Sequence, residues 1–362
     1  PFWLKPFWLK GEIEISKIAD LLSCSCHEVL CSNVLWHSKQ LHCDFMNSSD
    51  LPTTSFATIL PPSWRSCVSQ WLADDCPTFD VGGFVVGDKP EEAWLLGKSA
   101  GVLAGVPFVD AIFEELGCTV EWHMKEGDQV IPTPPHPKVH VATVRGAARR
   151  LLLGERTALN VLSRASGVAT EARQIVDIAR SHNWHGEVAA TRKVTPGFRL
   201  VEKYAVLVGG ASTHRMDLSH MVMLKDNHIW SKGSITAAIK SARLACGFSS
   251  KIDVECSSFE DAAEAAEAGA EIVMLDNFEP ESLKDVASRL KLRFPQLVIE
   301  ASGGITAVTI GKYLSKDVDV VSQGALTHGY ACLDFSLKIQ PSAKRLNGFE
   351  LDTIPHSHTH PC

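Results

Sequence analysis

Six polar or glycine residues stand where apolar, β-branched segments of the sequence end. Each follows a different segment: Lys193, Lys225, Glu255, Asp276, Ser302 and Gly324. If these segments are parallel strands of one sheet, their carboxyl ends lie together, and barrel enzymes build their active sites at that face. The positions therefore predict one shared site.

Basic side chains are concentrated around these positions. They are Arg192 and Lys193 in ATRK, His214 and Arg215 in STHR, Lys225 in MLKDNH, and Arg156 in LLLGERTALN. A single lysine or arginine is usually a solvated surface charge. A cleft lined by several cations instead attracts anions, and the arginine fork matches carboxylates and phosphates. We expect a ligand with several anionic groups.

The two carboxylates of the set, Glu255 and Asp276, offer a place for a cation. Mg²⁺ is usually held by one or two carboxylates together with substrate phosphates. The pair could therefore hold Mg²⁺ bound to a pyrophosphate. Either carboxylate alone could instead cap the helix that follows it.

The segment SGGIT, with Ser302, Gly303 and Gly304, follows the apolar run LVIEA and is expected to open a helix. Glycine lets the backbone approach a phosphate, and a helix amino terminus offers free N–H groups. A tight structural turn is the alternative. The position of the segment in the strand order matches the phosphate site that barrel enzymes build after their last strands.

The elements that must position these residues follow a regular alternation from Glu187 onward. The expected strands are EVAATRK, MVMLKD, KIDVECS, IVMLDN, LVIEASGG and VDVVSQG, with helical patterns such as SFEDAAEAAEAG between them. In that helix Ser257 or Ser258 can serve as the N-cap, and Gly269 can end it. Mostly apolar strands indicate a parallel sheet buried on both faces. An open sheet and a closed barrel both fit, and the polar strand ends favour a barrel.

The first part of the chain has a different character. From Trp64, WRSCVSQWLADDC predicts an amphipathic helix that starts a compact α/β module. The PTPPHPK stretch at 132–138 must be a surface loop, because prolines exclude helix interiors and central strands. Residues 1–62 lack apolar periodicity and are predicted to be a disordered extension. Their Cys24–Cys43 cluster, with Cys24, Cys26, His27 and Cys31, fits no common zinc spacing, and its role stays open.

Composition excludes several classes of function. A formal net charge of −7 argues against a nucleic-acid partner. No run of about 18 apolar residues is present, so no membrane span is expected. The 11 cysteines contain no CxxC pair, which favours a reducing, cytoplasmic setting. Neither a Walker A sequence nor a GxGxxG after a strand occurs, so kinase and dinucleotide-binding functions lose their usual support.

At this point the sequence resembles the quinolinate phosphoribosyltransferase family, and most closely its animal members. The motifs are GERTALNVLSRASGVAT, TRKVTPGFRLVEKYAVLVGGASTHR, MVMLKDNHI, VECSSFEDA, LDNF, EASGGIT and VDVVSQGALTH, and the resemblance covers about Trp64 to Lys338. It implies an α/β fold: an N-terminal α/β sandwich domain at 64–160 and an incomplete parallel α/β barrel at 161–328. Residues 329–350 would return to the first domain, and 351–362 would form a tail.

The resemblance also implies an activity. Family members transfer the phosphoribosyl group of phosphoribosyl pyrophosphate to quinolinate with loss of CO₂, in de novo NAD synthesis, and use Mg²⁺. They form homo-oligomers, either dimers or hexamers built as trimers of dimers, in which the first domain of one subunit covers the barrel mouth of another.

Carried over by residue, the resemblance gives each candidate a role. Arg156, Arg192, His214, Arg215 and Lys225 would bind the quinolinate carboxylates, with Arg156 reaching across from the partner subunit. Lys193 and Lys225 would also contact phosphoribosyl pyrophosphate. Glu255 and Asp276 would serve its ribose and Mg²⁺. The 5-phosphate would be held by Ser302, Gly303, Gly304 and Gly324.

Two other functions stay open on the residues alone. The chain could be a barrel lyase or aldolase with Lys225 as a Schiff-base nucleophile, or an inactive scaffold that binds phosphorylated metabolites. The extension before Trp64, the PTPPHPK loop and the PHSHTHPC tail depart from the family pattern, and none of them touches the predicted mouth.

Overall fold

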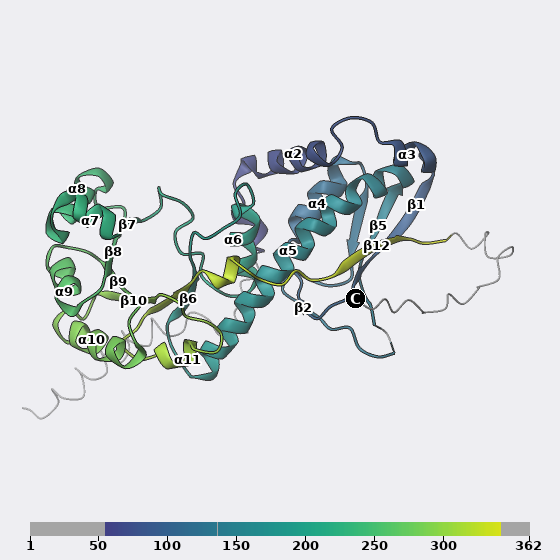
Figure 1. Ribbon diagram of the computed structural model, residues 1–362. Coiled ribbons are helices and arrows are strands. Elements are labelled where there is room, and N and C mark those ends of the chain that lie inside the picture. Colours follow the sequence, from purple (N-terminus) through teal and green to yellow (C-terminus); the bar gives the residue numbers. More distant parts are fainter. Residues whose placement is uncertain (1–54, 136, 342–362) are drawn as a thin grey trace, which may run out of the picture. The chain divides into compact units, whose positions relative to one another are not determined.

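The computed structural model of the protein describes residues 55–135 and 137–341 (Figure 1). The cysteine and histidine cluster near the start of the chain and the tail at 351–362 lie outside the described residues. So do residues 1–54, which make up most of the predicted extension. Within the described part, no helix combines the length and apolarity that crossing a lipid bilayer requires.

The first module is built on a four-stranded antiparallel sheet. Its strands are β1 (Pro90–Gly97), β3 (Thr119–Trp122), β5 (Val139–Ala147) and β12 (Phe335–Ile339), in the order β12-β1-β5-β3. Two short strands, β2 (Gly101–Val102) and β4 (Gln129–Val130), form a separate antiparallel pair. Because β12 pairs with β1, the end of the described chain returns to the first sheet, as Figure 1 shows.

Helices α2 (Arg65–Asp75), α3 (Val81–Val86) and α4 (Val106–Glu115) accompany this sheet, and α2 is the helix predicted from WRSCVSQWLADDC. Two 3-10 helices precede α2, η3 (Phe56–Ile59) and η4 (Pro62–Trp64). Phe56, Leu60 and Trp64 pack against the hydrophobic core. Ordered structure therefore begins before Trp64. These apolar side chains pack on the core although their spacing does not follow the period of an α-helix.

Helix α5 (Ala148–Ser181) is 34 residues long and contacts elements of both modules. It packs against α4, β1 and β5 of the first module, and against α6 (Arg199–Val208) and β6 (Glu187–Ala190) of the second. An apolar stripe that includes Leu151, Leu162 and Ile175 is fully buried along it.

The second module is a six-stranded parallel sheet, and all six predicted strands are present. Besides β6 they are β7 (Val222–Leu224), β8 (Ile252–Cys256), β9 (Ile272–Asp276), β10 (Val298–Ser302) and β11 (Val320–Gln323). The order is β6-β11-β10-β9-β8-β7. Beyond β6 the chain adds one further parallel bridge, between Ala189 and Ser212. Among the described residues no pairing joins this edge to β7, which makes the sheet an incomplete barrel, as predicted.

Helices alternate with these strands: α7 (Asp226–Lys232), α8 (Ile235–Cys246), α9 (Phe259–Glu267), α10 (Pro280–Arg293), α11 (Ile310–Tyr313) and the 3-10 helix η5 (Ala325–Thr327). Figure 1 shows α8, α9 and α10 following one another along the sheet. Helix α9 begins as predicted: the Ser258 side chain accepts a hydrogen bond from Asp261 N at 3.0 Å. Its end is also as predicted, since Gly269 follows with a φ of 99°.

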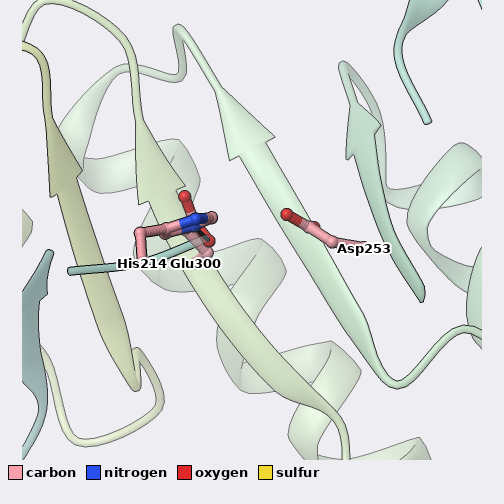
Figure 2. Close-up of side chains that lie close together, drawn as sticks. All are labelled: His214, Asp253 and Glu300. Atoms are coloured by element: carbon pink, nitrogen blue, oxygen red, sulfur yellow. Dashed lines mark hydrogen bonds and ion pairs between the residues drawn. The ribbon is translucent and has the colours of Figure 1, made fainter. Parts of the chain in front are cut away.

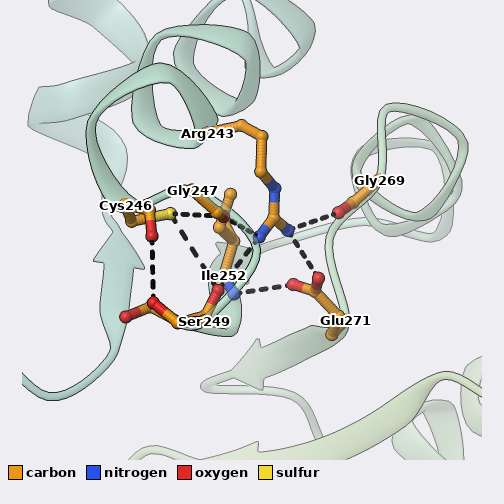
Figure 3. A network of polar contacts seen from close by, with 8 residues as sticks. Arg243, Cys246, Gly247, Ser249, Ile252, Gly269 and Glu271 are labelled. Carbon is orange, nitrogen blue, oxygen red and sulfur yellow. Dashed lines mark hydrogen bonds and ion pairs between the residues drawn. The ribbon is translucent and has the colours of Figure 1, made fainter.

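A polar network holds the amino ends of β8 and β9 (Figure 3). The Arg243 guanidinium pairs with Glu271 at 2.5 Å and donates to the carbonyls of Gly247 and Ser250, each at 2.9 Å. Glu271 in turn accepts from Ile252 N at 2.8 Å. This end of a barrel sheet usually serves stability, so the chemistry is sought at the opposite end.

Candidate active site

The predicted cationic and acidic side chains meet where β7, β8 and β9 end. Lys225 directly follows β7 and its ammonium pairs with the carboxylate of Glu255, in β8. Glu255 is paired in register with Met274, two residues before Asp276, so both carboxylates lie on the same face of the sheet. Lys225, Glu255 and Asp276 therefore form one cluster.

The cluster is only partly exposed, and this changes the acidity of Asp276. Burial raises the pKa of the Asp276 carboxyl, and the neighbouring Glu255 carboxylate raises it further, while Lys225 and Lys193 oppose the change. Two carboxylates that repel each other next to two lysines are the kind of group that could bind a cation and an anion.

The loop after β10 contacts the end of β9. Gly303 has a φ of 99°, and a Cβ placed on it would lie 2.5 Å from Asn277 N. Only glycine fits there. Ser302 O accepts a hydrogen bond from Asn277 N at 3.0 Å, which brings the SGG segment beside Asp276.

The SGGIT segment does not open a helix, and that prediction is wrong. Gly303 and Gly304 have positive φ values of 99° and 61°, which are incompatible with a right-handed helix. A turn follows, and α11 begins only at Ile310. The backbone of the loop is open on one side, because a Cβ placed on Gly304 would meet nothing within 4 Å.

Lys193 and Gly324 come together from the two neighbouring strands β6 and β11. A Cβ placed on Gly324 would lie 2.7 Å from Lys193 Cδ and 3.3 Å from its Nζ. Thr327 donates to Lys193 O at 2.8 Å, which fixes the backbone of this lysine. The glycine thus leaves space for the lysine side chain at the strand ends.

A second group of cations lies beside the first. His214 is nearly buried, with 9% of its side chain exposed, and Arg215 follows it. Burial lowers the pKa of Arg215, and so does the nearby Arg192 guanidinium. The two arginines are close enough to influence each other, and neither forms an ion pair with a carboxylate in the described part of the chain. Such uncompensated positive charge favours an anion.

Lys203 holds the two loops that carry these cations. This residue of α6 is only 1% exposed, and its ammonium donates to Ala190 O at 2.7 Å, Thr191 O at 2.9 Å and Thr213 O at 2.5 Å. Thr191 precedes Arg192, and Thr213 precedes His214. Burial lowers the pKa of Lys203 to about 8, and the charges of Arg199 and Arg192 add to the shift.

The preceding residue, Glu202, is fully buried and fixes the loop after Lys193. It accepts hydrogen bonds from the amide and the hydroxyl of Thr195, each at 2.8 Å. The sequence reading missed both Glu202 and Lys203. In the sequence RLVEKYAVLV, an acid and a base stand next to each other among apolar residues, and this could have pointed to buried charged side chains.

Sequence reasoning also missed Asp253 in β8 and Glu300 in β10. Both are buried, at 0% and 2% exposure. Each stands two residues before a predicted site residue, Glu255 or Ser302, and so shares its face of the sheet. A carboxylate in the middle of an otherwise apolar strand was the signal for each.

Arg156 is the one predicted residue that the structure does not join to the others. It is exposed in the first half of α5. It makes no hydrogen bond or ion pair with any residue in the described part of the chain. Its predicted role needs a second subunit and is not tested by one chain.

The fold defines a two-module, α/β-barrel type of protein, with cationic and acidic side chains gathered at its strand ends. Two family models match: the N-terminal domain of quinolinate phosphoribosyl transferase over residues 78–166 and its C-terminal domain over 168–338. The chain belongs to the quinolinate phosphoribosyltransferase family.

Curated relatives and solved structures agree with this assignment. The nicotinate-nucleotide pyrophosphorylase (carboxylating) of Rattus norvegicus is 51% identical over 78% of this chain and 93% of its own length. The Homo sapiens protein of the same name is 50% identical over 78% and 94%. The nicotinate-nucleotide pyrophosphorylase structure from Francisella tularensis, 28% identical, superimposes with a TM-score of 0.70 and covers 80% of this chain and 100% of its own.

Proposed function

We propose that the strand-end cluster is the active site at which this chain joins quinolinate to phosphoribosyl pyrophosphate. The chain is a quinolinate phosphoribosyltransferase (decarboxylating), a pentosyltransferase of de novo NAD synthesis. The products are nicotinate mononucleotide, pyrophosphate and CO₂. One observation supports the location above all: Lys225 pairs with Glu255, and the charges of Glu255, Lys225 and Lys193 all act on Asp276 at the strand ends.

The quinolinate carboxylates are assigned to the cations on the β6 side. Arg192 and Arg215 supply planar forks, which bind a carboxylate through two parallel hydrogen bonds. His214 lies between Thr213, held by Lys203, and Arg215. Lys225 and the Arg156 of a second subunit complete the proposed set. A substrate with two carboxylates suits such a surplus of positive charge.

Phosphoribosyl pyrophosphate is assigned to the two lysines and to the loops that follow β10 and β11. Lys193 and Lys225 would contact its phosphates, and the open backbone of the loop after β10, with Ser302, Gly303 and Gly304, would hold the 5-phosphate together with Gly324. The φ values of the two loop glycines leave their amides free of helix bonding.

Glu255 and Asp276 fit Mg²⁺ as hard oxygen ligands. Burial and the neighbouring Glu255 carboxylate raise the pKa of Asp276, and a divalent cation held by the pair would offset their repulsion. Mg²⁺ bound there would help to neutralise the charge of the departing pyrophosphate. In the described structure Lys225 already neutralises part of this acidic pair.

The chemistry asks the protein mainly to orient and to stabilise charge. The ring nitrogen of quinolinate forms a bond to the ribose carbon as the bond to pyrophosphate breaks. Lys193 and Lys225 stabilise the leaving charge. The nitrogen is then cationic, so the adjacent carboxylate can leave as CO₂, and the ring carbon that carried it takes up a proton. No nucleophile from the protein enters either step.

The homo-oligomer, a dimer or a hexamer built from dimers, and the cytoplasmic setting are part of the same proposal. Arg156 is exposed and has no partner in the described part of its own chain, as a residue that serves another subunit's site should be. All six described cysteines are unpaired, which suits a reducing compartment.

The direct test is an assay of quinolinate consumption and CO₂ release. Both should require phosphoribosyl pyrophosphate, and both should fall sharply when Mg²⁺ is chelated. Consumption of quinolinate without phosphoribosyl pyrophosphate would contradict the proposal. Borohydride inactivation in the presence of a carbonyl substrate would instead favour the lyase alternative, in which Lys225 must be an uncharged amine rather than the partner of Glu255.

A further inference from the structure

Two carboxylates lie one layer below the proposed substrate site, inside the incomplete barrel. Asp253 and Glu300 come from β8 and β10. Three of their four carboxylate oxygens, both of Asp253 and Oε1 of Glu300, have no hydrogen-bond partner. Burying such groups is costly unless they are compensated, so their presence under the site calls for a function.

The fourth oxygen has a specific partner. Glu300 Oε2 lies 2.9 Å from Nε2 of His214. Figure 2 shows Asp253 aimed at this pair from its own strand, and ligand atoms of the three side chains lie within 4.8 Å of one another. If Glu300 is ionised, its oxygen can only accept, and Nε2 is then the donor in this contact. The other ring nitrogen, Nδ1, makes no hydrogen bond with any described residue and is the one left for a ligand.

Arg215 is the cation that faces this acidic layer. The charges of Asp253 and Glu300 both favour its protonated form, against the burial and the Arg192 repulsion that lower its pKa. Asp253 and Glu300 thus lie beneath the two neighbouring residues proposed to bind quinolinate, His214 and Arg215. Burial, together with the Glu300 charge, holds the pKa of Asp253 well above its usual range.

The backbone of His214 needs this support. Its φ of 53° lies in the left-handed region, which a residue with a side chain occupies only when its surroundings enforce it. Lys203 holds the preceding carbonyl, Thr213 O, and Glu300 holds the ring. The main chain and the side chain of His214 are therefore each held by a different residue.

We propose that Glu300 is a positioning residue for quinolinate: through its contact with Nε2 it fixes the His214 ring so that a protonated Nδ1 can donate to a substrate carboxylate. This inference rests on the proposed function. It adds to the substrate site a residue that does not touch the substrate. Glu300 would orient His214 as a hydrogen-bond partner orients a metal-ligating histidine.

A divalent metal ion on His214, Asp253 and Glu300 is the competing explanation for the same three atoms. Arg215 and Lys225, whose charges act on Asp253, already supply positive charge beside these carboxylates. Metal analysis of the purified protein decides this point. One equivalent of a transition metal in the wild type that Glu300→Gln loses would overturn the positioning role.

The kinetic test compares Glu300→Gln with Glu300→Ala. The glutamine keeps the size and one acceptor oxygen, so it should raise the KM for quinolinate only a few fold. The alanine loses both and should raise it by about 10-fold or more. The KM for phosphoribosyl pyrophosphate should stay within about twofold in both, because Glu300 hydrogen-bonds to His214 and to no residue assigned to that substrate. A merely structural role would raise both KM values together.

Ser322→Ala is the matched control. Ser322 is buried in β11, and its hydroxyl has no hydrogen-bond partner. Removing it should leave both KM values unchanged, because no bond is broken. If Ser322→Ala raised the quinolinate KM as much as Glu300→Gln does, general packing of the barrel would explain the effect and the inference would be wrong.

A double-mutant cycle with His214→Ala completes the experiment. If Glu300 acts through His214, Glu300→Gln should have no further effect on quinolinate KM in that background. Should Glu300→Ala be insoluble, the cycle with the isosteric Gln variant still decides. Wild-type protein that fails to turn over quinolinate would refute the proposed function itself, whereas normal wild-type turnover with additive effects in the cycle would refute only the role of Glu300.

Discussion

Lys193 lies against Gly324, so closely that a methyl group on the glycine would be 2.7 Å from the lysine Cδ. The backbone of Gly324 has a φ of −77°, which alanine also adopts. The glycine is therefore required by space and not by conformation. Its neighbour across the strands is a lysine proposed to contact phosphoribosyl pyrophosphate.

This relationship predicts that Gly324→Ala displaces Lys193 without unfolding the protein. A displacement on the order of 1 Å in a site of this kind can reduce turnover by as much as about 10²-fold, and we expect a loss of about 10-fold in kcat/KM for phosphoribosyl pyrophosphate. Steady-state kinetics and the thermal midpoint check it. Gly82→Ala, where the nearest atom is 3.8 Å away, is the control and should behave as wild type.

Lys225→Ala should keep the fold and lose most of its turnover. The side chain is 44% exposed and pairs with Glu255 at the strand ends, so its removal leaves no cavity in the core. Loss of one preorganised group that stabilises developing charge commonly costs about 10²-fold or more in kcat. Circular dichroism and a CO₂-release assay test both parts. A purified variant with near-normal turnover would remove Lys225 from the active site.

Lys203 predicts a pH dependence in which binding and stability change in opposite directions. Its pKa is about 8 in the folded protein and about 10.4 when unfolded. As pH rises through about 8, the amine loses a proton and one of three hydrogen bonds, so the KM for quinolinate should rise about 2- to 10-fold.

The stability effect follows from the same shift. Burying the charged amine costs free energy below about pH 8, and this cost is relieved as pH rises toward about 10.4, because only the unfolded state then holds the proton. Lys203→Met should have a high KM already at pH 7 that does not change up to pH 9, and should lack the gain in stability. The exposed Lys240→Met is the control. Identical pH profiles for wild type and Lys203→Met would contradict the role of Lys203.

The sequence predicted the residues at the strand ends better than the buried residues that support them. Lys225, Glu255 and Asp276 could be placed together because buried parallel strands are visible as apolar runs whose ends must meet. Lys203 could not be found this way: a lysine in a helix is expected at the surface, and only tertiary structure supplies its three carbonyl partners. Glu300 sits inside a strand, where its meaning depends on which residues face it across the barrel.

The predicted disordered extension leads to a prediction about truncation. Phe56, Leu60 and Trp64 contact the core, and Trp64 packs edge-on against Phe108 with ring centroids 5.2 Å apart. Deleting residues 1–54 should leave activity and the thermal midpoint nearly unchanged. Deleting 1–64 should lower the midpoint by more than about 4 °C, because half-buried apolar side chains together contribute roughly 2 kcal/mol. Equal midpoints for the two truncations would show that these contacts are not stabilising.

Arg156 gives the last prediction, that each active site combines residues of two subunits. Arg156 makes no hydrogen bond or ion pair in the described part of its own chain, yet two substrate carboxylates favour another arginine fork. Arg156→Ala and Lys225→Ala should each be nearly inactive alone. Mixing them under conditions that exchange subunits builds some sites in which both residues are intact. For a dimer with statistical mixing, about one quarter of wild-type activity should return, since about half the dimers are mixed and each has one good site of two. The control is a mixture of Lys225→Ala with Glu255→Ala. It should stay inactive, because Lys225 and Glu255 belong to the same barrel, so subunit exchange cannot bring two intact residues into one site. Activity that remains at background after verified subunit exchange would place Arg156 outside a shared site.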